Sequence, residues 1–141
     1  MDHLAILSKK RKLLSKILSK EKRIESRWYK FRKPPVGCIA SGDTIYFKET
    51  GDPVSAKAKV EKVISYKNLN PKLITEIIRK HGELIGINLD FLDSVKEKRF
   101  CTLIFLKQAQ KIKPFKIDKR GYGLMNAWIS VPDISVLKRN C

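Results

Sequence analysis

The stretch Lys22-Arg23-Ile24-Glu25-Ser26-Arg27 holds the densest group of charged side chains beside an apolar position. Side chains alternate between the two faces of a strand, so a strand over residues 23–29 places Glu25 and Arg27 on one face. Lys22 then lies at the junction with the preceding segment. A carboxylate among cations can accept hydrogen bonds from a base, transfer a proton, or belong to a solvated ion-pair surface. The pattern alone leaves all three roles open.

The flanking sequence predicts short strands interrupted by three helices. The expected elements are a strand at 4–7, a helix at 9–21, strands at 23–29, 44–47 and 54–63, helices at 71–82 and 88–98, and strands at 100–106, 115–117 and 125–131. The helices separate the strands too unevenly for a doubly wound parallel sheet. We therefore expect an α+β fold, a small β-barrel of five to seven strands with about three peripheral helices.

Length and composition set the class of protein. The chain has 141 residues, 43% of them hydrophobic, which fits one globular domain over residues 1–141. No apolar run is long enough for a membrane span, and no secretory signal is apparent at the start. We expect a soluble, cytoplasmic protein.

The charge is strongly positive and unevenly distributed. The formal net charge is +17, and residues 1–33 carry twelve basic and three acidic side chains. Such a field attracts polyanions, because each neutralised phosphate releases a condensed counterion. RNA is the expected partner, DNA is possible, and a membrane surface is not expected because the segment lacks a broad apolar face.

Cysteine and histidine give no sign of a metal site or of a cofactor. Cys38, Cys101 and Cys141 are far apart, and the only histidines are His3 and His81. A zinc site needs about four such ligands at short spacings. We expect structural or incidental roles for all five, and neither metal nor cofactor.

The six-residue stretch resembles the G-x-K-x-x-E-x-R signature of the ASCH domain, in the PUA-like superfamily. Lys20 stands where the signature has glycine. The surrounding pattern matches too, because a short strand and a helix precede the signature and a Gly42-Asp43 turn before a strand follows it. Segment 119–123 is similar to the closing region of archaeal members. The resemblance covers residues 3–131 and leaves a C-terminal tail at 132–141.

The resemblance implies a PUA-like barrel with a cleft lined by the signature residues and a role in binding RNA or nucleotides. One branch of the family hydrolyses acetylated cytidine with a Lys, a Thr and a Glu. Lys22 matches that Lys, whereas Glu25 occupies the position of the Thr and cannot serve as a hydroxyl nucleophile.

Aromatic residues among the cations suggest stacking of unpaired bases. Trp28 and Tyr29 adjoin Arg27, although Trp28 has the size of a core residue, and Trp128 is expected in the core. Tyr122, between two glycines, is the better candidate for an exposed stacking residue.

Three hypotheses follow. The first is an RNA-binding module that seats a nucleotide in a basic cleft. Its expected binding residues are Lys9, Lys10, Arg11, Lys12, Lys16, Lys20, Lys22, Arg23, Glu25, Arg27, Lys30, Arg32 and Tyr122. The second is a small hydrolase, an amidohydrolase for acetylated cytidine or a ribonuclease, with Lys22 and Glu25 as catalytic groups. The third is a basic domain that docks on an acidic protein.

Overall fold

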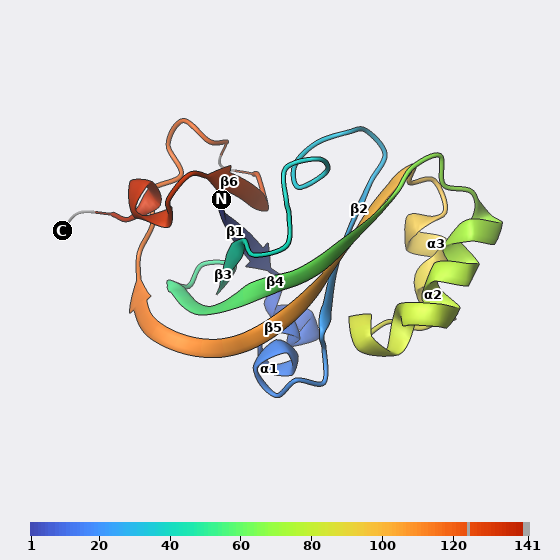
Figure 1. Cartoon of the computed structure of the whole chain (residues 1–141), viewed down its shortest axis with the longest axis horizontal. Coiled ribbons are helices and arrows are strands. Elements are labelled where there is room, and N and C mark those ends of the chain that lie inside the picture. The colour runs from blue at the N-terminus through green and yellow to red at the C-terminus, as the bar shows by residue number, and fades with distance from the viewer. Residues whose placement is uncertain (124, 140–141) are drawn as a thin grey trace.

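The computed structural model describes residues 1–123 and 125–139, and its frame is one six-stranded mixed sheet. The strands are β1 (Asp2–Leu7), β2 (Ile24–Tyr29), β3 (Thr44–Glu49), β4 (Val54–Tyr66), β5 (Phe100–Phe115) and β6 (Trp128–Val131). Their order is β2-β5-β4-β3-β1-β6, with β1 and β3 parallel and the other pairs antiparallel. The long β4 and β5 curl together, so the sheet forms a half-barrel (Figure 1).

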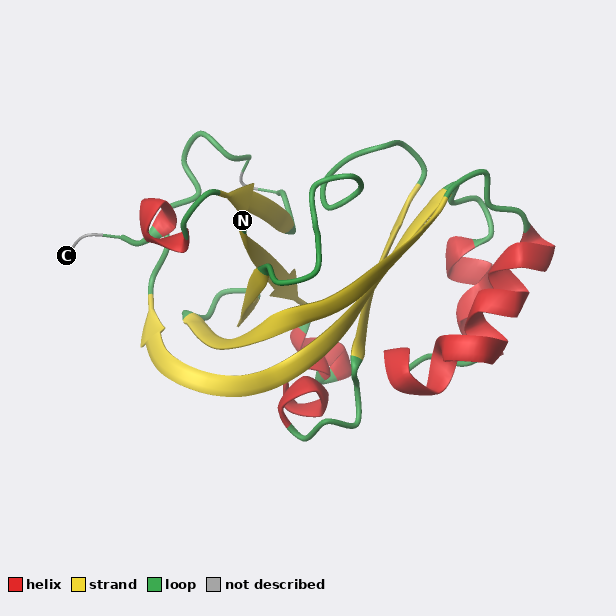
Figure 2. Cartoon of the chain, in the orientation of Figure 1, coloured by secondary structure: helices red, strands yellow, loops and turns green. Residues whose placement is uncertain are grey.

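Helices cover the sheet at separate places. The α-helices are α1 (Leu13–Leu18), α2 (Pro71–Ile85) and α3 (Leu92–Val95), and the 3-10 turns are η1 (Lys9–Arg11), η2 (Leu89–Phe91) and η3 (Ile134–Leu137). Figure 2 shows α2 and α3 together at one end of the curled ribbon and η3 at the other. This arrangement confirms the expected α+β fold with about three peripheral helices, and the expected small β-barrel takes the form of a curled six-stranded half-barrel.

Three apolar clusters fill the spaces between the sheet and these helices. One joins the centre of the sheet to α1, one joins β2 and β5 to α2, and the third joins β6 to η3. Trp128 is buried in the first cluster, as expected, and Trp28 packs at the margin of the second. Buried residues continue beyond residue 131, because Ile134 and Leu137 belong to the third cluster.

The helix expected at 9–21 is wrong in extent. Ser8 caps a 3-10 turn as its N-cap, and Lys12 then adopts a left-handed backbone conformation (φ 52°), which separates η1 from α1. An α-helix cannot pass through that conformation without a break. The helical segment is therefore two short pieces, η1 and α1.

Helix α2 also runs further than expected, to Ile85, with the left-handed Gly86 as its cap (φ 88°). Gly82 lies inside the helix, where a Cβ would meet the Ile87 carbonyl oxygen at 2.7 Å. Glycine at position 82 therefore permits a close backbone approach and does not end the helix.

Other boundaries differ as well. The strand expected at 100–106 continues to Phe115, and of the piece expected at 115–117 only Phe115 belongs to it, while Ile117 forms an isolated bridge with Lys138. The helix expected at 88–98 reduces to η2 and α3, and the last strand begins at Trp128. Cys101 is buried and Cys38 exposed, while Cys141 lies outside the described residues. No helix in the described part of the chain combines the length and hydropathy that a membrane crossing needs.

A polar cluster forms around the buried His3 ring, where β1 meets β6 and the turn before β3. The His3 ring forms two hydrogen bonds of 2.8 Å, one between Nδ1 and Ser130 Oγ and one between Nε2 and Asp43 Oδ2. The Trp128 indole N–H donates to Ser130 Oγ at 3.2 Å. We call His3, Asp43 and Ser130 the histidine cluster.

Candidate nucleic-acid interface

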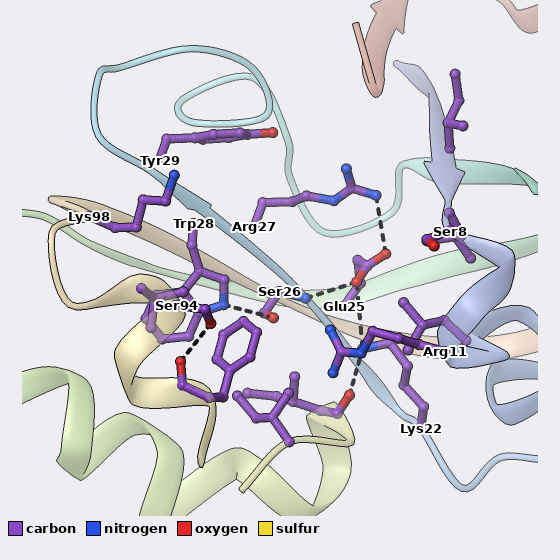
Figure 3. A pocket seen from close by; sticks show the side chains of 17 residues that line it. Ser8, Arg11, Lys22, Glu25, Ser26, Arg27, Trp28, Tyr29, Ser94 and Lys98 are labelled. Atoms are coloured by element: carbon purple, nitrogen blue, oxygen red, sulfur yellow. Dashed lines mark hydrogen bonds and ion pairs between the residues drawn. The ribbon is translucent and has the colours of Figure 1, made fainter. Parts of the chain in front are cut away.

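A pocket of about 400 Å³ lies beside β2, the edge strand of the sheet. The end of β1, the turn η1 and the segment from η2 to α3 form its other walls (Figure 3). Its charged lining residues are Arg11, Lys22, Glu25, Arg27 and Lys98. The half-barrel leaves this space because β2 pairs with β5 on one side and with no strand of the described sheet on the other. We call it the first pocket.

The signature residues converge on the first pocket. Glu25, Arg27 and Tyr29 point from one face of β2, while Ser26 and Trp28 point from the other, as strand alternation predicted (Figure 3). Both sets of side chains line the pocket, because it lies over the edge of the strand. We call Lys22, Glu25 and Arg27 the signature cluster.

Lys22 is buried, with 3% of its surface exposed, and its ammonium is surrounded by oxygen atoms. Nζ donates to the carbonyl oxygens of Ile24 and Ile85 at 2.7 Å and lies 3.5 Å from Glu25 Oε1. Burial lowers the pKa of Lys22, and the Glu25 carboxylate opposes that shift. Three acceptors match the three donors of an ammonium, so Lys22 holds β2 against the end of α2.

Glu25 is also buried, with 3% of its surface exposed. Burial by itself would raise the pKa of Glu25, but Lys22 and Arg27 together outweigh it and hold that pKa below its usual value. Oε1 accepts from the Ser26 backbone N–H at 3.1 Å, and Oε2 accepts from Arg27 at 3.3 Å.

Together, Lys22 and Glu25 satisfy two outward-facing backbone groups of the edge strand, the Ile24 carbonyl and the Ser26 N–H. An open strand edge otherwise invites pairing with another chain. This protection of the edge also fixes both side chains at the pocket wall.

Arg27 bridges the open side of the half-barrel. Its guanidinium lies 5.1 Å from the centre of the Trp128 ring on β6 and donates to the Ala127 carbonyl oxygen at 3.5 Å. Its side chain is 13% exposed, so it remains accessible from the pocket. Arg27 therefore connects the two edge strands of the sheet through a cation–π contact.

The opposite wall is aromatic. Trp28 packs edge-to-face on Phe91 with ring centres 5.8 Å apart, and its indole N–H donates to Ser26 Oγ at 2.9 Å. The Arg11 guanidinium lies 5.5 Å from the centre of the Phe91 ring. The pocket thus combines cations with aromatic rings, the combination that holds unpaired nucleotides.

The remaining predicted binding residues divide into separate groups. Lys20 and Arg23 line a different pocket, which they share with Lys22. Lys9 pairs with Asp52 at 2.9 Å, and Lys30 lies over the Phe31 ring. The residues outside both of these pockets are Lys9, Lys10, Lys12, Lys16, Lys30, Arg32 and Tyr122. Tyr122 is 39% exposed, as expected, but lies beside Arg120 and Arg139.

Sequence reasoning missed the part of the pocket contributed by distant segments. Ser8, Phe91, Ser94 and Lys98 line it and were not expected to. Residues 91–98 resemble an ordinary amphipathic helix, and no local pattern indicates that the fold brings them to β2. The spacing of the signature predicts only what β2 itself presents.

No family model and no curated protein matches this chain. The crystal structure of ASCH from Zymomonas mobilis is similar in fold, with a TM-score of 0.70 and 15% identity over 98% of this chain and 96% of that one. A mutant of that protein gives a TM-score of 0.69 at 15% identity, over 98% and 99% of the two chains. A hypothetical protein of known structure gives 0.50 at 20% identity, over 79% and 100%. The fold is therefore that of ASCH proteins.

Proposed function

We propose that this chain binds RNA, with DNA as a weaker alternative, and that the first pocket seats one unpaired nucleotide. The observation that carries the proposal is the charge balance of the pocket, in which four cationic side chains face a single carboxylate. A volume of about 400 Å³ is in the range of small-molecule sites and accommodates one nucleotide. The fold shared with ASCH proteins supports a PUA-like, RNA-binding type of domain.

The cations have distinct roles in this proposal. Arg11 and Lys98 lie at the walls and contact phosphate, because neither forms an ion pair among the described residues. Arg27 keeps its contact with Glu25 and presents its remaining donors to the nucleotide. A planar guanidinium with several donors suits phosphate or a base edge.

The polar groups of the pocket supply the contacts to the base. Glu25 Oε2 accepts one hydrogen bond from Arg27 and retains capacity for another from a base amino group. The carbonyl oxygens of Arg23 and Tyr29 accept hydrogen bonds from Leu106 and Arg99, on the β5 side of the strand. Backbone groups alternate in direction along an antiparallel strand, so those of the even-numbered Trp28 face away from β5. Its N–H and carbonyl therefore face the pocket side and can pair with a base edge.

Lys22 is a positioning residue in this proposal. The second hypothesis, a hydrolase, needs the Lys22 amine as an activating group and Glu25 as a proton donor and acceptor. The amine already has three oxygen partners, and the pKa of Glu25 is lowered by Lys22 and Arg27 against the effect of burial, so Glu25 is not a reservoir of protons near neutral pH. The geometry favours binding over hydrolysis.

The test is a titration of single-stranded RNA followed by fluorescence anisotropy at several salt concentrations. Affinity should fall steeply with salt, since several phosphates are contacted. Arg11→Gln and Arg27→Gln should each lower affinity about tenfold, as expected for one charge-assisted hydrogen bond. Lys72→Gln, on the exposed start of α2, is the charge-matched control and should behave like the wild type.

Equal effects of Arg11→Gln and Lys72→Gln would contradict the proposed pocket, and binding that is independent of salt would contradict nucleic acid as the ligand. To separate binding from hydrolysis, the protein is incubated with RNA and with acetylated cytidine. Recovery of both compounds unchanged supports binding, and cleavage of either supports the hydrolase. The proposal also includes a similarity to archaeal ASCH proteins and a cytoplasmic location.

A further inference from the structure

A second pocket, of about 440 Å³, adjoins the first and has a similar charge balance. It lies between the turn that follows α1, the end of α2, and the middle of β5. Its basic lining residues are Lys20, Lys22, Arg23 and Lys107. Lys22 belongs to the walls of both pockets, so the two spaces are neighbours.

Three of the four cations of the second pocket, all except Lys22, form no ion pair in the described part of the chain. Glu61 is the one acidic residue among the described lining residues, and it forms no ion pair with Lys20, Arg23 or Lys107 in the described chain. Arg23 Nε donates to the Lys20 carbonyl oxygen at 3.3 Å, and this bond holds the guanidinium at the rim. The arrangement leaves a concentrated positive charge that an anion can neutralise.

Two residues of this pocket have a backbone conformation that is unfavourable for their type. Lys20 has a φ of 69° and Gln108 a φ of 54°, and they are two of the four non-glycine residues with positive φ in the described chain. The left-handed region disfavours side chains with a Cβ. Such conformations gather at ligand sites, where the fold retains them despite their cost in stability.

The strand register adds a third unfavourable feature at the same place. Lys107 on β5 is directly opposite Lys59 on β4. Like charges opposite each other in antiparallel strands are destabilising. Lys59 Nζ donates to Thr44 Oγ1 at 2.7 Å, which leaves Lys107 as the member of the pair that lines the pocket.

We propose that the second pocket binds a second, phosphate-bearing nucleotide of the same RNA strand, next to the one in the first pocket. This inference rests on the proposed function. Lys20, Arg23 and Lys107 hold the phosphate, and the apolar side chains of Leu84 and Phe105 form the floor against which the ribose or base packs. The shared Lys22 wall makes the two sites adjacent along one strand.

The experiment compares single-stranded oligoribonucleotides of one to six nucleotides on the wild type and on variants of each pocket. Affinity in the wild type should rise once the strand is long enough to reach both pockets. Lys20→Gly and Lys107→Gln should remove most of that rise, about fivefold to tenfold each, and reduce the salt slope by about one for each phosphate that is no longer neutralised. Neither variant should change the affinity for a mononucleotide.

Lys20→Gly provides a readout that a merely structural lysine would not give. Glycine tolerates the left-handed conformation at position 20, so this variant should melt at a higher temperature than the wild type while it binds long strands more weakly. Lys72→Gln is again the control for net charge. The opposite signs of the two effects exclude misfolding as the cause of weaker binding.

The outcomes distinguish the two proposals. If Arg11→Gln and Arg27→Gln affect no oligonucleotide, the proposed function fails. If those variants weaken binding while Lys20→Gly and Lys107→Gln match Lys72→Gln at every length, only the second site is overturned. Loss of mononucleotide affinity in Lys20→Gly would also contradict a separate second site.

Discussion

The chain contains two polar clusters built on buried ionisable side chains, and they differ in what surrounds them. The signature cluster lies at the edge strand β2, while the histidine cluster lies between β1, β3 and β6. In the signature cluster two cations face one carboxylate. In the histidine cluster the Asp43 carboxylate pairs with His3 and with the amino group of Met1.

The difference lies in surplus charge and in access. The signature cluster lines a pocket with two further cations, whereas no residue of the histidine cluster lines either of the two pockets described above. The Trp128 ring, 5.5 Å from the His3 ring, closes the histidine cluster. Burial and hydrogen bonding alone therefore do not distinguish a binding site from a structural cluster. An excess of positive charge beside an open pocket does distinguish it. The contacts Ser130–His3–Asp43 have the order of a hydrolytic triad, yet here they join β1 to β6 and to the turn before β3.

The largest expected effect breaks the signature cluster. Glu25→Gln removes the carboxylate that compensates Lys22, and an uncompensated buried charge costs about 3–5 kcal/mol. Urea denaturation of the variant should show a loss of that size. The double variant Lys22→Met/Glu25→Gln should be more stable than Glu25→Gln alone, and equal stabilities would contradict the coupling of these two residues.

A smaller effect tests the histidine cluster through pH. Burial lowers the pKa of His3 below 6.5, although Asp43 raises it in part. The unfolded chain therefore takes up a proton before the folded chain does, so this contribution to stability is complete above pH 6.5 and declines as the pH falls below it. His3→Gln should cost about 1–2 kcal/mol at pH 8, because its hydrogen bonds are removed, and should flatten the decline.

His81 is the control for that experiment, because its pKa is also lowered by burial and by Lys80 and Lys62. It is only partly buried and forms no hydrogen bond through Nε2 in the described chain. His81→Gln should leave most of the decline in place. If the decline disappears in His81→Gln and persists in His3→Gln, the pH response comes from His81 and the prediction for the histidine cluster is wrong.

The smallest effect contrasts the two clusters through a ligand. A nucleoside monophosphate at ten times its dissociation constant should stabilise the folded chain by about 1.4 kcal/mol, which raises the melting temperature by about 3–5 °C. The same increase should occur in His3→Gln, whose cluster lies apart from the pocket. Arg27→Gln should show little increase, and an undiminished increase there would separate ligand binding from the signature cluster.

The sequence supports the prediction of the signature cluster because that prediction depends on local geometry. Glu25 and Arg27 are two residues apart on one strand, so alternation alone brings them together, and the resemblance adds Lys22. Strand spacing also predicted a small β-barrel in the α+β class, although it did not predict that the sheet closes only as a half-barrel. The role of His3 was not, since a histidine in the apolar run of β1 gives no indication of partners 40 and 127 residues away.

The wrongly predicted boundaries of the first helix and of β5 have causes that the sequence pattern does not reveal. Lys12 and Lys20 take left-handed conformations that lysine rarely adopts, so the pattern predicted one continuous helix where the chain bends twice. Strand β5 extends through residues 107–113, where five of the seven residues are exposed Lys or Gln. Propensity cannot detect a strand whose stability comes from its partner, here β4.

The position of β1 has a consequence for how the chain acquires its structure during translation. β1 pairs with β3 on one side and with β6 on the other, so the earliest of the six strands obtains its second neighbour only after the latest has left the ribosome. Long-range pairing of this kind slows folding, because a large loop must close before the contact forms. The edge of β1 that faces β6 therefore stays unpaired until residues 128–131 have been synthesised.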